Sequence, residues 1–113
     1  MRIAIIGSRN FSNEILFTET IKSLPFVITE IISGGAKGAD TLAANWANQQ
    51  SIKLTVYKPD WAKYGKAAGV VRNKLIVEDC EYCLVFWDSK SYGTKFSIDY
   101  CNKLNKTIRI VTY

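Results

Sequence analysis

A glycine-rich stretch from Ser33 to Asp40, which reads SGGAKGAD, holds the densest group of residues that could bind a ligand. Its glycines would allow positive φ angles and let a ligand come close to the backbone N–H groups. If a helix starts here, its unpaired N–H groups and partial positive charge attract phosphate, and Ser33 and Lys37 can add a hydroxyl and a charge. The same glycines would also suit a tight strand-to-helix turn that binds nothing, so this stretch alone leaves both interpretations open.

Two common phosphate-binding patterns do not fit the sequence. Gly38 is followed by Ala-Asp rather than by the Lys-Ser/Thr of a Walker A loop. After the first apolar run, Gly7-Ser8-Arg9 stands where a dinucleotide-binding domain would have GxGxxG. The sequence therefore indicates neither NTP hydrolysis nor ordinary dinucleotide redox chemistry. A second candidate phosphate turn is Gly93-Thr94, which would open a later helix.

Aromatic and acidic side chains follow the third apolar run, where the sequence reads KPDWAKY. Trp61 and Tyr64 could stack on a base. Asp60 could accept a hydrogen bond from a ribose hydroxyl or from the base. The alternative is that the two aromatic rings pack beneath a loop.

Basic side chains dominate residues 58–74, where Asp60 is the single acidic residue. Such a local positive field predicts an anionic partner, either a nucleotide or a nucleic acid. The alternative is a helix face that simply contacts water, and for Arg72-Asn73 the sequence favours neither. The basic residues are Lys58, Lys63, Lys66, Arg72 and Lys74.

Histidine is absent from the chain, so neither a Ser-His-Asp nor a Cys-His catalytic set is possible. Cys80 and Cys83 form a C-x-x-C pair that could bind zinc or act in redox chemistry. With no histidine and only Cys101 besides, we expect reduced, buried, structural thiols instead. The carboxylates are scattered, and we expect no metal site and no cofactor.

The overall composition predicts one folded domain over residues 1–113. Apolar residues make up 48% of the chain and charged residues 22%, which is typical of globular proteins. No apolar run reaches the roughly 18 residues of a membrane helix, and Arg9 cuts short a run that could serve as a signal peptide. We expect a cytoplasmic protein without membrane contact, whose net charge of +5 favours anionic partners.

Five apolar segments predict β-strands, and the segments between them have the length and periodicity of helices. In the last of these, Phe96, Tyr100 and Leu104 fall on one helical face. The alternation predicts an α/β fold, a single Rossmann-like domain with a parallel sheet and helices on both faces. The expected strands are Arg2–Ile6, Val27–Ser33, Leu54–Tyr57, Tyr82–Trp87 and Thr107–Thr112.

The apolar pattern of each strand predicts its place in the sheet. The sequences IAII in the first strand and CLVFW in the fourth are continuously apolar, as in strands buried on both faces. KLTVY in the third and TIRIVTY in the fifth alternate, as in half-exposed edge strands. The predicted order is therefore 3-2-1-4-5, in which the winding reverses between strands 1 and 4. Ligands bind past the carboxyl ends of the strands at such a switch point.

The polar and glycine-rich turns all follow the carboxyl ends of expected strands, so we expect them to share one rim of the sheet. The candidate catalytic residues on this rim are Asp60, Asp88 and Arg72. The predicted ligand-binding residues are Gly7, Ser8, Arg9, Ser33, Gly34, Gly35, Ala36, Lys37, Gly38, Asp40, Asp60, Trp61, Tyr64, Arg72, Asn73, Trp87, Asp88, Gly93 and Thr94.

Four segments, IIGSRNF, ISGGAKGADTLAANWA, PDWAKYGKAAGVVRN and FWDSKSYGT, together resemble the SLOG superfamily, and among its branches the small YpsA-related SLOG proteins of bacteria and phages. The resemblance covers nearly the whole chain in the right order. It implies a Rossmann-like fold that binds nucleotides or nucleotide-derived signals. The superfamily also includes the lonely-guy phosphoribohydrolases and the DNA-processing protein A family, whose GSR and SGxAxGxD patterns this chain shares.

The resemblance to lonely-guy enzymes breaks at the catalytic acid. Those enzymes have a PGGxGTxxE motif, whose acid assists cleavage of an N-glycosidic bond, and an arginine on the preceding helix. Gly93-Thr94 match the GT and Arg72 matches the arginine, but Ser97 occupies the position of the acid. Asp60 or Asp88 could substitute, although nothing in the sequence shows it.

Three functions are compatible with these residues. We expect first a binding module that holds a nucleotide or an ADP-ribose- or NAD-like ligand as sensor, carrier or sponge. The alternatives are a nucleoside monophosphate phosphoribohydrolase and a single-stranded nucleic-acid binding protein, the latter because aromatic residues lie among lysines. The missing acid favours binding over catalysis, and the small size and single rim favour a small ligand over nucleic acid. A homodimer or higher homo-oligomer would fit the family resemblance.

Overall fold

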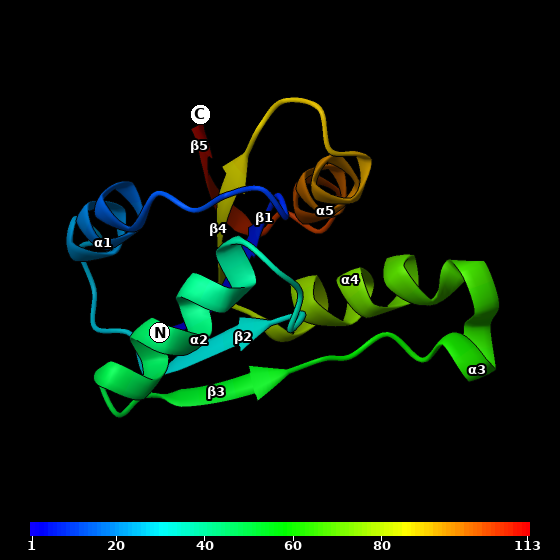
Figure 1. The fold of residues 1–113 in the computed structure, drawn as a ribbon, viewed down its shortest axis with the longest axis horizontal. Coiled ribbons are helices and arrows are strands. Elements are labelled where there is room, and N and C mark those ends of the chain that lie inside the picture. The colour runs from blue at the N-terminus through cyan, green and yellow to red at the C-terminus, as the bar shows by residue number, and fades with distance from the viewer.

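The structure is a computed structural model that describes residues 1–113. Its five strands are all parallel and pair in the order β3-β2-β1-β4-β5 (Figure 1), which confirms the predicted α/β Rossmann-like fold and strand order. None of the helices has the length and apolar character needed to cross a membrane. The strands are β1 (Arg2–Gly7), β2 (Glu30–Ser33), β3 (Lys53–Val56), β4 (Tyr82–Trp87) and β5 (Thr107–Thr112). The helices are α1 (Glu14–Lys22), α2 (Ala39–Gln49), α3 (Trp61–Tyr64), α4 (Ala68–Asp79) and α5 (Tyr92–Lys103), with a 3-10 turn η1 (Gly65–Ala67).

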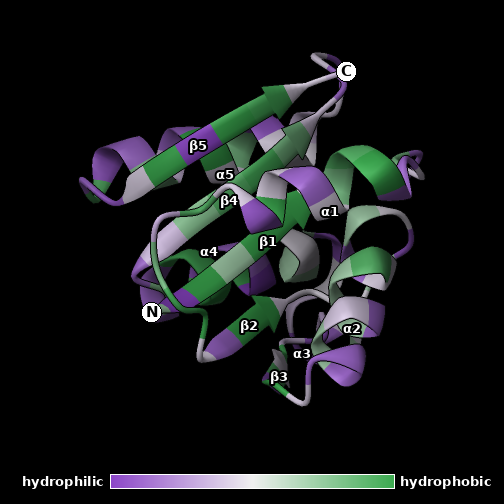
Figure 2. Ribbon diagram, turned by 90° about the vertical axis from the view of Figure 1, so that its left-hand side faces the viewer, coloured by the Kyte–Doolittle hydropathy of each residue, from purple (hydrophilic) through white to green (hydrophobic).

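Strands β1 and β4 form the centre of the sheet and pair from Ile3–Tyr82 to Gly7–Phe86. Residues 3–5 of β1 and 83–86 of β4 are fully buried, and β1 is hydrophobic along most of its length (Figure 2). The edge strands β3 and β5 keep exposed side chains. Continuous apolar runs therefore mark the central strands, which helices cover on both faces.

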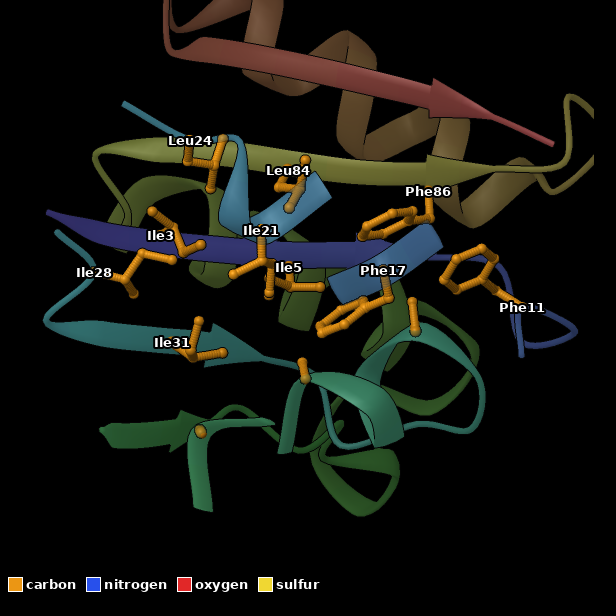
Figure 3. Packing of buried hydrophobic residues seen from close by; sticks show 13 residues of the cluster. Ile3, Ile5, Phe11, Phe17, Ile21, Leu24, Ile28, Ile31, Leu84 and Phe86 are labelled. Atoms are coloured by element: carbon orange, nitrogen blue, oxygen red, sulfur yellow. The ribbon is translucent and has the colours of Figure 1, made fainter. Parts of the chain in front are cut away.

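Helices α1 and α2 cover one face of the sheet and enclose the larger of two hydrophobic cores (Figure 3). Three aromatic rings extend this core toward the carboxyl ends of the strands. The ring of Phe11 stacks on Phe86 with centroids 4.6 Å apart, and Phe17 lies 5.4 Å from Phe86. This packing fixes the segment between β1 and α1 that begins with Ser8.

Helices α4 and α5 cover the opposite face around a second core, which contains Ile76 and Ile98. The three cysteines lie together in this core as free, buried thiols. Cys83 Sγ is 3.3 Å from Cys80 Sγ and 2.8 Å from Cys101 Sγ. The thiols thus join the end of α4, strand β4 and helix α5 at one point.

Strand β2 begins at Glu30, three residues later than the sequence pattern predicts. The side chain of Val27 is 80% exposed, and its carbonyl accepts a hydrogen bond from the Met1 amino group at 3.1 Å. Thr29 N–H donates to the Met1 carbonyl at 2.9 Å. Backbone groups of Val27 and Thr29 therefore bond to Met1 instead of to a neighbouring strand. The apolar residues Val27 and Ile28 precede β2.

The residues after β3 form a short helix that the sequence pattern does not predict. Asp60 caps α3, because its Oδ1 accepts a hydrogen bond from Lys63 N–H at 3.1 Å. All residues from Asp60 to Ala67 are exposed. Figure 1 shows α3 at the far end of the molecule, away from the sheet.

At the amino ends of the strands, Arg2 connects β1, β2 and α4. Its Nη2 lies 2.7 Å from Asp79 Oδ1, and its Nε lies 3.3 Å from Glu30 Oε1. Tyr57 and Thr55 donate hydroxyl hydrogen bonds to Asp79 and Glu30, at 2.9 Å and 2.8 Å. Hydrogen bonds from Arg2 are the main cause that lowers the pKa of both carboxyls.

Candidate functional site

A cavity of about 410 Å³ lies past the carboxyl ends of β1, β2 and β4, at the point where the winding of the sheet reverses. Its floor comes from the ends of the strands, and α4 and α5 supply its walls. The lining residues are Ile5, Ile6, Gly7, Ser8, Arg9, Asn10, Gly34, Ala36, Asp40, Arg72, Asn73, Ile76, Asp88, Ser91, Gly93, Thr94 and Ser97.

The glycine-rich turn shapes one side of this cavity. Gly35 and Gly38 have φ angles of +70° and +76°, which L side chains rarely adopt, so both glycines are required by the backbone itself. Gly38 also lies directly against the backbone of Ser8 and Arg9, where a Cβ atom would collide. The tight packing brings the turn after β2 against the turn after β1.

Two backbone donors of this turn are engaged by side chains of the turn. Ala36 N–H donates to Asp40 Oδ2 at 3.0 Å, and Gly35 N–H donates to Ser33 Oγ at 3.4 Å. Asp40 is buried in the first turn of α2, so its carboxylate opposes the partial positive charge of that helix. Burial raises the pKa of Asp40, and the Ala36 N–H and Arg72 counteract that rise. An additional phosphate would meet a negative charge at this helix end.

Arg72 turns from α4 toward the cavity rather than toward water. Its Nη1 donates to the Gly34 carbonyl at 2.7 Å, and its Nε donates to Asn73 Oδ1 at 2.9 Å. Burial lowers the pKa of Arg72, while the nearby Asp40 carboxylate opposes that effect. The guanidinium is thus fixed against the glycine turn, with its Nη2 free of protein partners.

The first turn of α5 presents unpaired donors to the same cavity. Ser91 precedes the helix without capping it, and the N–H groups of Gly93 and Thr94 have no acceptor in the protein. A Cβ atom on Gly93 would meet nothing closer than Asn73 Nδ2 at 3.9 Å, so the space beside it is open. This helix end is available to an anion.

Asp88 braces the loop between β4 and α5. Its Oδ1 accepts hydrogen bonds from Lys90 N–H at 2.9 Å and Ser91 N–H at 2.8 Å, and its Oδ2 accepts from Ser91 Oγ at 3.1 Å. These bonds, above all the one from the Ser91 N–H, lower the pKa of Asp88 to about 2. The Asp88 N–H in turn donates to Ser8 Oγ at 3.2 Å, which ties this loop to the end of β1.

Comparisons with known proteins place the chain in a family. The model of the YspA, cpYpsA-related SLOG family matches residues 1–64. The gene 61 protein of Mycobacterium phage D29 is 31% identical over 104 residues, which cover 83% of this chain and 82% of that protein. The chain belongs to the YspA, cpYpsA-related SLOG family.

A solved structure shows the same fold. DNA processing protein A from Streptococcus pneumoniae superposes with a TM-score of 0.79 at 20% sequence identity. The match covers 96% of this chain and 49% of the other, so this SLOG-family chain spans about half the length of that protein.

The cavity of this SLOG-family chain brings together eleven of the residues that the sequence indicates as ligand-binding. They come from the carboxyl ends of β1, β2 and β4 with the turns that follow, and from α2, α4 and α5, so they share one rim of the sheet. Arg72 and Asp88, two of the three candidate catalytic residues, are among them. The eleven are Gly7, Ser8, Arg9, Gly34, Ala36, Asp40, Arg72, Asn73, Asp88, Gly93 and Thr94.

The remaining predicted residues do not line the cavity. Asp60, Trp61 and Tyr64 belong to the exposed α3 segment, where Trp61 is 57% exposed. Trp87 directs its Nε1 to the Ser91 carbonyl at 3.2 Å, and the side chain of Lys37 is exposed. Ser33, Gly35 and Gly38 shape the turn without lining the cavity.

Six further residues line the cavity, although the sequence does not indicate them as ligand-binding. Ile76 lies one helical turn after Arg72, and Ser97 lies three residues after Thr94, so helical periodicity carries both toward the same cavity. Asn10 and Ser91 are polar residues beside turns that the sequence does indicate. The six residues are Ile5, Ile6, Asn10, Ile76, Ser91 and Ser97. No group of three or more Cys, Asp and Glu side chains is arranged to hold a metal ion.

Proposed function

We propose that this chain binds a phosphorylated, nucleotide-derived small molecule in the cavity, as a sensor, carrier or sponge. The observation that carries the proposal is that Arg72 and the unpaired N–H groups of Gly93 and Thr94 line one cavity. An arginine fork and a helix N-terminus are complementary to phosphate oxygens. Membership of a SLOG family supports a role connected with nucleotides.

The carboxylates around the cavity support binding rather than glycosidic cleavage. Asp88 and Asp40 accept hydrogen bonds from their own turns, and Asp60 caps α3 away from the cavity. Ser97 donates to the Gly93 carbonyl at 3.2 Å. Cleavage of an N-glycosidic bond proceeds through a cationic sugar, and the two carboxylates that line the cavity are held in place by hydrogen bonds within their own turns. Purified protein incubated with nucleoside monophosphates should therefore release no free base, as measured by chromatography.

Isothermal titration calorimetry with AMP, ADP-ribose and adenosine tests the binding proposal. We expect the two phosphorylated compounds to bind and adenosine to bind far more weakly. Arg72→Gln should weaken phosphorylated ligands by about tenfold or more, since a hydrogen bond to a charged group is lost. Arg109→Gln is the matched control, because Arg109 contacts Ser23 on another surface. Equal affinity of wild-type and Arg72→Gln protein for AMP would contradict the proposal.

Nucleic-acid binding is a second candidate function, favoured by the exposed α3 segment. Trp61 and Tyr64 are 57% and 41% exposed, and Lys63 lies over the Tyr64 ring at 5.1 Å. Aromatic rings among lysines bind single strands by stacking and by contacts to phosphate. The name of the structural relative, DNA processing protein A, agrees with this. Fluorescence anisotropy with a labelled single-stranded oligonucleotide would show salt-sensitive binding that Trp61→Ala weakens.

A further inference from the structure

The wall of the cavity contains no aromatic side chain. Its four hydrophobic residues are small or aliphatic, and all the others are glycine, polar or charged. Proteins usually hold a nucleobase by stacking it on an aromatic ring, and such a contact is worth about 1–3 kcal/mol per base. The lining therefore lacks an aromatic surface on which a base would stack. The four hydrophobic residues are Ile5, Ile6, Ala36 and Ile76.

None of the aromatic residues on neighbouring segments lines the cavity. Trp61 lies against Gly69 of α4, where an added Cβ would be 3.9 Å from its Cη2. Trp87 is hydrogen-bonded to Ser91, and Tyr113 donates to Asn10 Oδ1 at 2.6 Å while its ring packs on Phe11. Tyr92 is 89% exposed and does not line the cavity.

Arg72 also offers a restricted surface for stacking. A Cβ atom on Gly34 would lie 2.7 Å from Nη1, 3.0 Å from Cζ and 3.2 Å from Nε, so the guanidinium lies directly against the glycine backbone. Its Nη1 and Nε bonds to Gly34 and Asn73 fix the group within the wall. The free Nη2 donors suit a phosphate oxygen.

The remaining donors suit the hydroxyl groups of a sugar. Asn73 uses its Oδ1 for Arg72 and Asn10 uses its Oδ1 for Tyr113, so each keeps its Nδ2 amino group free to donate. A Cβ atom added at Gly93 would lie 3.9 Å from Asn73 Nδ2, so this amino group borders the open space beside Gly93. Phosphate donors and hydroxyl donors thus line the same walls.

We propose that the cavity holds the phosphorylated sugar of its ligand and leaves the base outside. The ligand class is then a pentose 5-phosphate moiety, alone or within a nucleotide, with little discrimination between bases. This inference rests on the proposed function, because it assumes that the cavity is the phosphate site.

Calorimetric titrations with ribose 5-phosphate, AMP, GMP, CMP, UMP and ribose test the inference. We expect the four nucleotides to bind within about fivefold of one another and ribose 5-phosphate within about tenfold of AMP, since no stacking energy is lost. Ribose without phosphate should bind far more weakly. A nucleotide that binds about a hundredfold more tightly than ribose 5-phosphate would overturn the inference and leave the proposed function intact.

Two variants separate the cavity from the exposed aromatic segment. Asn73→Leu should weaken ribose 5-phosphate and AMP by the same factor, whereas Trp61→Ala should change neither affinity. If Trp61→Ala weakens AMP about tenfold and leaves ribose 5-phosphate unchanged, α3 holds the base and the inference is wrong. If no phosphorylated compound in the panel binds, the proposed function fails, and the inference fails with it.

Discussion

At the scale of single residues, the contact between Gly34 and Arg72 fixes the position of the Arg72 guanidinium in the wall of the cavity. A Cβ atom on Gly34 would lie 2.7 Å from Arg72 Nη1, so even a methyl group must displace the guanidinium. We predict that Gly34→Ala weakens AMP binding by about tenfold or more in calorimetry, because Arg72 loses its position in the wall. The fold should tolerate this change, since Gly34 does not have a positive φ.

Gly69→Ala is the matched control for this residue-scale prediction. Its Cβ would make ordinary contact with Trp61 at 3.9 Å, and Gly69 lies inside α4. The change should raise the free energy of unfolding by about 0.5–1 kcal/mol and leave AMP binding unchanged. Gly35 is a poorer site for such a test, because its φ of +70° strains any side chain. Wild-type affinity in a folded Gly34→Ala protein would show that Arg72 does not bind the phosphate.

At the scale of elements, the loop between β4 and α5 depends on the charge of Asp88. Its pKa is lowered to about 2 by hydrogen bonds from the Ser91 and Lys90 N–H groups and the Ser91 hydroxyl. Because the native pKa lies below the unfolded value of about 4, these bonds stabilise the loop fully above that value. Their contribution is lost as the pH falls toward 2. We predict an Asp88 carboxyl midpoint of about 2 in a ¹³C NMR titration, and a higher midpoint in Ser91→Ala. A midpoint near 4 in the wild-type protein would mean that the hydrogen bonds from Lys90 and Ser91 do not stabilise the Asp88 carboxylate.

The elements differ in how well the sequence predicts them. Strands β1 and β4 are predicted with their places in the sheet, because burial on both faces requires unbroken apolar runs. The four-residue helix α3 is too short for helical periodicity, and its one signal is Asp60 as a capping residue. The start of β2 is misjudged because Val27 is apolar yet exposed, with its carbonyl bonded to the chain terminus.

The residues of the candidate site also differ in how well the sequence predicts them. Glycine turns after strands are predictable, since the carboxyl ends of parallel strands meet at one rim. Trp61 and Tyr64 are near Arg72 in sequence, but the direction in which α3 leaves the sheet depends on packing that no local pattern encodes. The engagement of Ala36 N–H by Asp40 is also a tertiary detail, and so are the unpaired N–H groups of Gly93 and Thr94 at the start of α5.

At the scale of the whole molecule, Arg2 connects three elements at the end opposite the cavity. Its hydrogen bonds lower the pKa of Glu30 and Asp79. The two carboxylates therefore contribute to the free energy of unfolding above the unfolded pKa of about 4, and this contribution is lost below it. We predict that the midpoint temperature of thermal unfolding, followed by circular dichroism, decreases when the pH is lowered from about 6 to about 3. The fall should be shallower in Arg2→Met. Parallel curves for the two proteins would show that these ion pairs do not govern acid stability.

The exposed segment from Asp60 to Ala67 divides the chain at a simple boundary of the sheet. The part before it supplies β3, β2 and β1, and the part after it supplies β4 and β5, so the two halves meet along one ladder from Ile3–Tyr82 to Gly7–Phe86. Lys63 and Lys66 within this segment are open to trypsin. A single cut there would produce two fragments, each with a contiguous part of the sheet. The two fragments would meet at the buried contact between β1 and β4. The ligand cavity takes its lining from both halves, so it exists only where the two halves are joined.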